Sequence, residues 1–179
     1  PKDGGQYGLR LSWYLPELND TELSFYHMNY HSRRPLFSGV MADFTDTTIK
    51  QDLGYIAQNE ITAANYTDLG AFSKVQLVYP EDIKLYAMSF NTVVGTTSVA
   101  GELTFRQDEP LQIDDVELLF AAMPQQLAHP DVNPAVIRTD LEGISQMGYY
   151  DPGATPDGFV LSDTVQAQMT LTHLFGPSF

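Results

Sequence analysis

The feature that most constrains this chain is a strict two-residue alternation of apolar and polar side chains. In 7–15, apolar side chains such as Leu9 and Trp13 occupy every second position. The same alternation recurs in 99–106 and 165–172. Successive side chains of a β-strand point to opposite faces of its sheet. The alternation therefore predicts strands that have one apolar face and one polar face.

Two turn-like sequences connect extended segments. Residues 16–20 separate 7–15 from the extended segment 21–31, and residues 95–98 separate 83–94 from 99–106. Pro, Glu, Asn, Asp, Gly, Ser and Thr dominate both turns, and such turns between alternating segments favour antiparallel hairpins. We expect two hairpins, followed later in the chain by a lone strand.

Two further segments are less regular. From Thr21 to His31, the apolar side chains change faces near Tyr26, which indicates either a β-bulge or a strand that leaves the lipid zone early. Segment 74–79 is also strand-like, and we expect it to extend the second hairpin, with a break at Pro80.

Two long connections, 32–82 and 108–163, separate the strands. The chain has 23 acidic and 9 basic residues, and 108–163 contains eleven of these acids, one base and six of the eleven prolines. Proline removes a ladder donor, so we expect a solvated loop there rather than continuous sheet, with a divalent-cation site as the sharper alternative. Asp114 resembles a helix cap, which predicts one short helix that ends before Pro124.

Short turns at one end of the strands and long connections at the other are typical of outer-membrane barrels. Residues 1–179 are therefore expected to form part of one all-β, antiparallel transmembrane β-barrel of about five strands, with 32–82 and 108–163 as loop or plug excursions. The chain begins at Pro1 and ends at Phe179, which suggests an internal piece of a longer protein. A soluble β-sandwich is the main alternative fold.

Composition excludes several classes of function. The net charge of −14 and the scattered basic residues argue against a nucleic-acid partner. The absence of cysteine excludes disulfides and thiolate metal sites. No apolar run of about 18 residues is present for a membrane-spanning helix.

The polar faces of the strands supply the candidate functional residues. If the apolar faces meet lipid, polar side chains on the opposite faces point into the lumen. Glu22 is less secure than the others, because its segment changes faces. Opposite charges such as Glu102 and Arg106 are expected either to form a ladder that lines or plugs the pore, or only to hydrate the interior and fix the strand register. The lumen-lining candidates are Arg10, Glu102, Thr104, Arg106, Gln166, Gln168 and Thr170.

An apolar patch in the predicted short helix is a second candidate. It is either a hydrophobic plug or entry site, or a satellite packing cluster. Its members are Leu118, Leu119, Phe120 and Met123.

Residues that suggest catalysis or metal binding do not form a recognisable site. His27 and His31 would lie about 13 Å apart on a strand, too far to share an ion. Ser32 adjoins His31, but neighbours on a strand point to opposite faces, and no G-x-S-x-G motif is present. We expect no enzyme activity, no catalytic residue, no metal and no cofactor.

Several sequence blocks together resemble a known family. They lie within two stretches, 5–33 and 79–106, which together make up about a third of the chain, and they are fairly specific in combination. The family is the proteobacterial outer-membrane family catalogued as domain of unknown function 1302. The blocks are Gly5–Gly8, Tyr14–Glu22, Tyr26–Arg33, Tyr79–Tyr86, Ser89–Thr92 and Ala100–Arg106.

The resemblance implies an outer-membrane β-barrel in a Gram-negative bacterium, related in plan to the long-chain fatty-acid porins. It implies association with a periplasmic lipoprotein and an inner-membrane exporter, and it brings no catalytic motif. We therefore expect a barrel in outer-membrane lipid that passes or binds a hydrophobic small molecule. The alternatives are a structural or adhesive surface barrel without transport, and a secreted β-rich binding module.

Overall fold

The protein divides into two compact units in a computed structural model, which describes residues 4–123 and 143–176. The stretches expected as excursions, 32–82 and 108–163, supply the residues of the second unit. Unit 1 comprises Pro1–Arg34, Tyr79–Pro110 and Leu161–Phe179, and unit 2 comprises Pro35–Val78 and Leu111–Val160.

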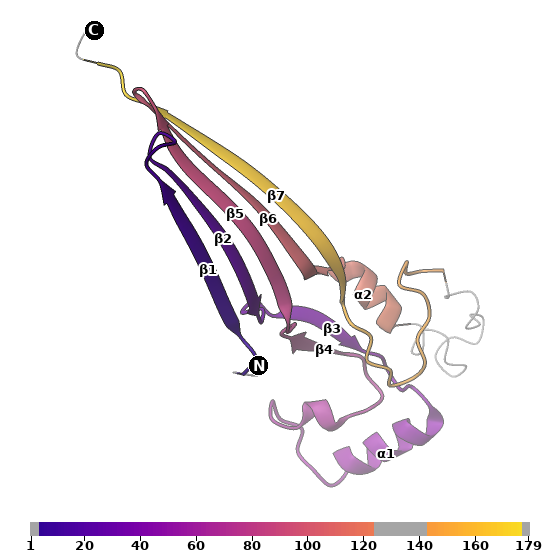
Figure 1. Ribbon diagram of the computed structural model, residues 1–179. Coiled ribbons are helices and arrows are strands. Elements are labelled where there is room, and N and C mark those ends of the chain that lie inside the picture. Colours follow the sequence, from indigo (N-terminus) through magenta and orange to yellow (C-terminus); the bar gives the residue numbers. More distant parts are fainter. Residues whose placement is uncertain (1–3, 124–142, 177–179) are drawn as a thin grey trace. The chain divides into compact units, whose positions relative to one another are not determined.

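Unit 1 is built on one five-stranded sheet, in which the strands lie in the order β1-β2-β5-β6-β7 (Figure 1). The first four strands are paired antiparallel. Side-chain contacts from Thr97 to His173 and from Glu109 to Thr164 run in opposite directions along β6 and β7, so this pair is antiparallel as well. The predicted antiparallel β class is confirmed. The strands are β1 (Tyr7–Leu15), β2 (Thr21–Tyr30), β5 (Ile83–Val94), β6 (Thr97–Gln112) and β7 (Phe159–His173).

Both predicted hairpins are present. The turn between β1 and β2 places Asn19 and Asp20 at φ values of 53° and 55°, a left-handed conformation that Asn and Asp tolerate. Val94 pairs with Thr97, so the turn between β5 and β6 has only two central residues. The first of them, Gly95, has a φ of 62°, as a tight hairpin turn requires.

Strand β6 is longer than the alternation predicted, because it continues through Pro110 to Gln112. Its pairing with β5 ends where Lys84 meets Gln107. Beyond that point the edge of β6 that faced β5 no longer needs donors, and a proline without an N–H is tolerated there.

Unit 2 contains a separate two-stranded sheet, formed by β3 (Leu36–Val40) and β4 (Lys74–Val78). The expectation that 74–79 extends the second hairpin is therefore wrong. The physical reason is that the extended chain breaks between β4 and β5, where Pro80 has no N–H and Asp82 has a φ of 60°, and β4 pairs with β3 instead. The remaining elements of unit 2 are α1 (Asp46–Ile56), η1 (Tyr66–Asp68) and α2 (Asp115–Ala122).

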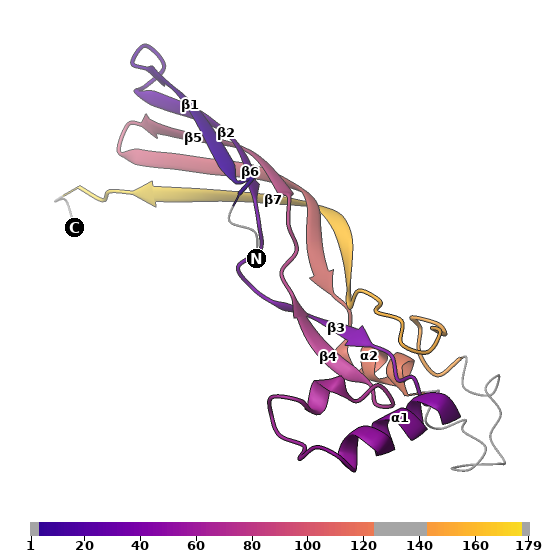
Figure 2. The ribbon, with the colours of Figure 1, turned by 90° about the horizontal axis from the view of Figure 1, so that it is seen from below.

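The predicted short helix is confirmed as α2. The Asp114 carboxylate accepts a hydrogen bond from the Val116 N–H at 2.8 Å and so caps the first turn. The helix packs beside β3 (Figure 2), with Leu118 buried against the strand. Gly39 permits this approach, because a Cβ there would lie 3.1 Å from Leu118 Cδ1 and 2.8 Å from Met41 Cε.

Helix α1 is fastened to the chain that follows it. The buried carboxylate of Asp52 accepts hydrogen bonds from the N–H groups of Gly70 and Ala71, at 3.1 Å and 2.8 Å. The Tyr55 hydroxyl donates to Asp68, and this hydrogen bond raises the pKa of Tyr55. Within the described ranges, no helix has the length and apolar character needed to cross a membrane.

Candidate functional site

One face of the five-stranded sheet is apolar and exposed. The strand register places the odd positions of β1, β2 and β6 and the even positions of β5 on this side. We call it the apolar face. Thirteen of its large side chains are between 37 % and 69 % exposed, and they are Tyr7, Leu9, Leu11, Trp13, Phe25, Tyr86, Met88, Val94, Leu103, Phe105, Val165, Met169 and Leu171.

This sheet has little hydrophobic core of its own. Among the described residues of unit 1, Ile83 is the one buried apolar side chain, whereas unit 2 buries Met41, Ala42, Ala71 and Leu118 among others. Soluble monomers rarely expose a contiguous apolar surface of this extent. The apolar face therefore needs an apolar environment outside the sheet.

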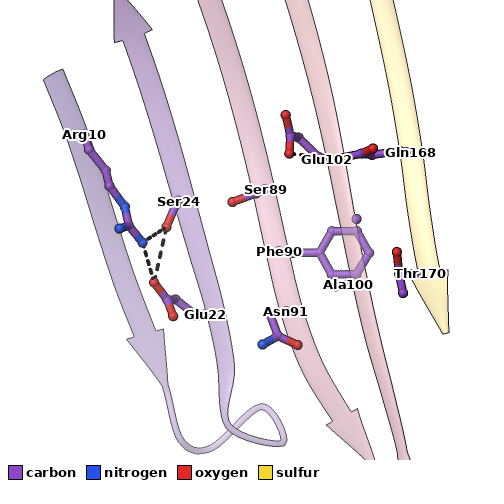
Figure 3. Close-up of a pocket in the computed structure, with 11 residues that line it drawn as sticks. Arg10, Glu22, Ser24, Ser89, Phe90, Asn91, Ala100, Glu102, Gln168 and Thr170 are labelled. Atoms are coloured by element: carbon purple, nitrogen blue, oxygen red, sulfur yellow. Dashed lines mark hydrogen bonds and ion pairs between the residues drawn. The ribbon is translucent and has the colours of Figure 1, made fainter. Parts of the chain in front are cut away.

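The opposite, polar face carries a hydrogen-bonded cluster on β1 and β2 (Figure 3). Arg10 Nη2 donates to Glu22 Oε1 at 2.8 Å and to Ser24 Oγ at 3.1 Å. Ser24, which is 2 % exposed, also lies 2.8 Å from the Ser12 hydroxyl. The Arg10 guanidinium stands 5.4 Å from the centre of the Tyr26 ring, within cation–π range. Arg10 is thus held by an ion pair, a hydroxyl and an aromatic ring.

A second polar cluster lies on β6 and β7. The Glu102 carboxylate accepts from the Thr104 hydroxyl at 3.0 Å and from Gln168 Nε2 at 3.1 Å. Arg106 Nη1 donates to Gln166 Oε1 at 3.4 Å and lies 4.0 Å from Glu109 Oε2. Each carboxylate oxygen of Glu102 therefore has a protein donor, but Arg106 retains donors for other partners.

A groove of about 270 Å³ runs along the polar face between the two clusters. Long side chains form its walls, with Arg10 and Glu22 on one side and Glu102 and Gln168 on the other (Figure 3). Ser89, on the central strand between them, is short and leaves the floor open. The groove offers hydroxyl, amide and carboxylate groups for hydrogen bonding.

The described residues that line the groove include two serines and no histidine. The Ser24 hydroxyl is bonded to Arg10, Ser12 and Glu22, and the Ser89 hydroxyl lies 3.4 Å from the Tyr26 hydroxyl. Across the parts of the chain that the structure describes, no three histidine or carboxylate side chains converge to hold a metal ion. The arrangement is suited to solvating a passage or holding a polar ligand group.

The structure brings the predicted lumen-lining residues onto one face. Register and side-chain contacts place all seven on the polar face, and Arg10, Glu102, Gln168 and Thr170 border the groove. Glu102 and Arg106 do not contact each other in a direct ladder. Glu102 binds Thr104 and Gln168, and Arg106 binds Gln166 and Glu109.

Sequence reasoning missed the serines of the groove. Ser24 and Ser89 face each other across β2 and β5, and their signal was their position on the same alternating face as Glu22. Glu22 proved to be the ion-pair partner of Arg10. The register of β2 is continuous on both sides from Glu22 to Asn29, so the change of faces near Tyr26 is not caused by a bulge in β2.

The four apolar plug or entry candidates divide between packing and exposure. Leu118 is buried against β3, whereas Leu119 and Phe120 are 52 % and 40 % exposed, and Met123 follows the last residue of α2. Leu119 borders a largely apolar groove of about 400 Å³ that also includes Val75 of β4. Leu118 is thus a packing residue, and Leu119 is available to a ligand.

Residues of the recognised sequence blocks meet at the end of the sheet that carries the start of β1. The buried His31 ring lies 2.8 Å from Gly4 O through Nε2 and accepts the Asp82 N–H at Nδ1, at 3.0 Å. Asn29 Nδ2 donates to Gly5 O and to Asp82 Oδ1, each at 3.0 Å. We call this network the N-terminal clasp, because it fastens the segment before β1 to β2 and β5.

No curated protein and no solved structure matches the chain. A family model described as "Protein of unknown function (DUF1302)" matches residues 1–177. The match spans both units and includes every sequence block that the resemblance rested on, so the chain belongs to the DUF1302 family of proteins of unknown function.

Proposed function

We propose that the protein forms part of a β-barrel in the bacterial outer membrane, in which the five-stranded sheet is a section of the wall. The apolar face meets lipid, and the polar face lines a passage for a hydrophobic small molecule. The sheet ends at β1 and β7, and a membrane barrel takes at least eight strands, so further strands complete the wall.

The observation that carries this proposal is the contrast between the two faces of one sheet. Leu103 and Phe105 would be buried if the sheet packed in the core of a soluble sandwich, yet they are 45 % and 37 % exposed. On the same strand, Thr104 is 4 % exposed and hydrogen-bonded to Glu102. Apolar outside and polar inside is the pattern of a barrel wall.

A hydrophobic passenger is supported by the apolar groove beside Leu119 and Val75 in unit 2. The net charge of −14 disfavours anionic passengers and leaves neutral apolar molecules unaffected. The periplasmic lipoprotein and the inner-membrane exporter that the family resemblance implies are proposed as partners in the same pathway.

Membrane location is tested by fractionation of the full-length protein from a Gram-negative host. We expect it to sediment with outer membranes after alkaline carbonate washing and to be released by detergent. Release without detergent would contradict the proposal and would favour the secreted binding module.

Passage is tested with two neighbouring substitutions on opposite faces of β5. Ser89→Trp fills the groove, whereas Met88→Trp points to the lipid side and serves as the matched control. The readout is uptake of the hydrophobic dye N-phenyl-1-naphthylamine by cells that express each variant. We expect Ser89→Trp to reduce uptake and Met88→Trp to leave it unchanged. Equal uptake by both variants and the wild type would favour a surface barrel without transport.

A further inference from the structure

On the apolar face, apolar side chains give way to polar ones at the same level on two paired strands, β2 and β5. Along β2, this face carries Phe25, then His27 and then the polar Asn29. Along β5, read in the same direction, it carries Met88, then Tyr86 and then the charged Lys84. A coordinated change on neighbouring strands indicates a change in the surroundings rather than an irregularity of one strand.

A row of aromatic rings marks the level at which this change occurs. His27 pairs with Tyr86, which pairs with Phe105 on the next strand, and Tyr7 lies beside His27 on β1. The His27 ring stacks on Tyr86 with centroids 4.6 Å apart, and its Nε2 lies 3.3 Å from the Tyr7 hydroxyl. The Tyr86 and Phe105 centroids are 6.2 Å apart. We call these four residues the aromatic row.

The two strands of the β5–β6 hairpin have the same length between the aromatic row and their turn. The register places nine residues in 86–94 and nine in 97–105, whereas β2 has seven, 21–27, between the row and its own hairpin turn. On the apolar face, these segments carry no Asp, Glu, Lys or Arg. Nine residues match the roughly 9–11 that a tilted strand needs to cross a membrane. At about 3.3 Å per residue and the usual tilt, they span about 20 Å of depth.

We propose that the aromatic row lies at the boundary between the hydrocarbon core and the headgroup layer of the membrane. The inference rests on the proposed function and specifies its membrane-contact surface. The partner is phospholipid or lipopolysaccharide acyl chain on the hairpin side of the row, and headgroups with water on the other side. Amphipathic rings such as tyrosine prefer this level, because one end is apolar and the other forms hydrogen bonds.

The structure beyond the row is consistent with an aqueous environment. Asp108, just past Phe105, has a φ of 59° and interrupts the alternation, since Arg106 and Glu109 approach each other although they are three residues apart. On the inner face at this level, β2 and β5 carry Met28 and Leu85, beside Arg106 of β6. On β2 and β5, apolar side chains thus turn inward where the outer face leaves lipid.

The boundary is tested by site-directed spin labelling, for which the cysteine-free sequence is suited. Single variants of the full-length protein, Met88→Cys, Leu103→Cys, Lys84→Cys and Gln107→Cys, are labelled with a nitroxide in phosphatidylcholine vesicles. Collision rates are measured with oxygen, which concentrates in lipid, and with a water-soluble nickel chelate. Ser89→Cys, on the opposite face beside Met88, is the matched control for a groove position.

We expect oxygen to dominate at Met88 and Leu103 and the nickel chelate to dominate at Lys84 and Gln107, with a change of sign in the logarithm of their ratio. Oxygen dominance at all four positions would overturn the boundary and leave the membrane proposal intact. Nickel dominance at all four would overturn both. Equal ratios at Met88 and Ser89 would show that the apolar face does not meet lipid.

Discussion

At the scale of single residues, the N-terminal clasp depends on the buried ring of His31. The Asp82 N–H donates to Nδ1, so the neutral ring carries its proton on Nε2 and donates it to Gly4 O. Both ring nitrogens are therefore used, and the side chain is 6 % exposed. The His31 ring therefore connects two segments that are distant from it in sequence, at Gly4 and at Asp82.

Replacing His31 is expected to loosen this end of the sheet. His31→Ala leaves the Asp82 N–H without its partner, which costs about 2 kcal/mol of unfolding free energy. The control is His173→Ala, because His173 is exposed and makes its side-chain hydrogen bond to Thr97 at the other end of the sheet. Urea unfolding in the presence of detergent micelles measures both variants. Equal losses of unfolding free energy in the two variants would show that the N-terminal clasp stabilises the sheet no more than an exposed hydrogen bond does.

His27 is expected to act as an aromatic ring rather than as a ligand. Its Nδ1 is buried and has no hydrogen-bond partner among the described residues. His27→Phe keeps the stacking on Tyr86 and removes the unsatisfied nitrogen, so we expect unchanged stability or a gain of about 1 kcal/mol. His27→Ala is the comparison, and we expect it to destabilise the protein. Urea unfolding measures both, and a clear loss with His27→Phe would show that the imidazole is required.

At the scale of elements, strands β5 and β6 are fitted together by a glycine. A Cβ on Gly101 would lie 2.4 Å from Phe90 Cε1, so the ring of Phe90 occupies the space above Gly101. The pair lies on the apolar face, directly beside Leu23 of β2. An aromatic ring that covers a cross-strand glycine helps to fix the register of two strands.

Gly101→Ala is expected to displace the Phe90 ring and to cost about 1–3 kcal/mol of unfolding free energy. In the double variant Phe90→Ala with Gly101→Ala, the added methyl group has room, so the two losses should not add. Gly54→Ala is the control, because no atom lies within 4 Å of a Cβ there, and a helix gains stability from alanine. If the losses of unfolding free energy from Phe90→Ala and Gly101→Ala add in the double variant, the proposed contact between the Phe90 ring and residue 101 is contradicted.

Elements were predictable where the signal was local. Alternation in 7–15 and 99–106 identified strands, and Asp114 identified the start of α2, because side-chain direction and capping depend on neighbours in sequence. The partner of β4 was not predictable in this way. Its pairing with β3 joins residues such as Phe37 and Leu77 across a long connection that has no period of its own.

The candidate site was predictable in its face but not in its contacts. The alternation assigned Arg10 and Glu102 to one side of the sheet, where the structure places them. It could not show that Arg10 pairs with Glu22, since this contact depends on the register that the first turn sets between β1 and β2. Likewise, the change of faces at Tyr26 became interpretable only when β5 showed the same change beside it.

At the scale of the whole molecule, the two units differ in how they bury apolar side chains. Unit 2 has its own small core around Met41, Ala71 and Leu118, whereas the sheet of unit 1 exposes most of its apolar side chains. The proposed barrel explains this difference, because lipid takes the place of a core for unit 1. The proposed barrel also predicts which side of the membrane each end of the sheet faces. Outer-membrane barrels have short turns in the periplasm and long connections outside the cell.

We therefore expect residues of unit 2 to be accessible from outside intact cells. An epitope inserted after Asn59, in the exposed segment that follows α1, should bind antibody on whole cells. The same epitope inserted at Asn19, in the turn between β1 and β2, should bind antibody only after the outer membrane is permeabilised. Flow cytometry with and without permeabilisation measures both variants, and retention in the outer-membrane fraction confirms that each has folded. The reverse pattern of accessibility would place the short turns outside the cell, and accessibility of both epitopes on intact cells would contradict a sheet that crosses the membrane.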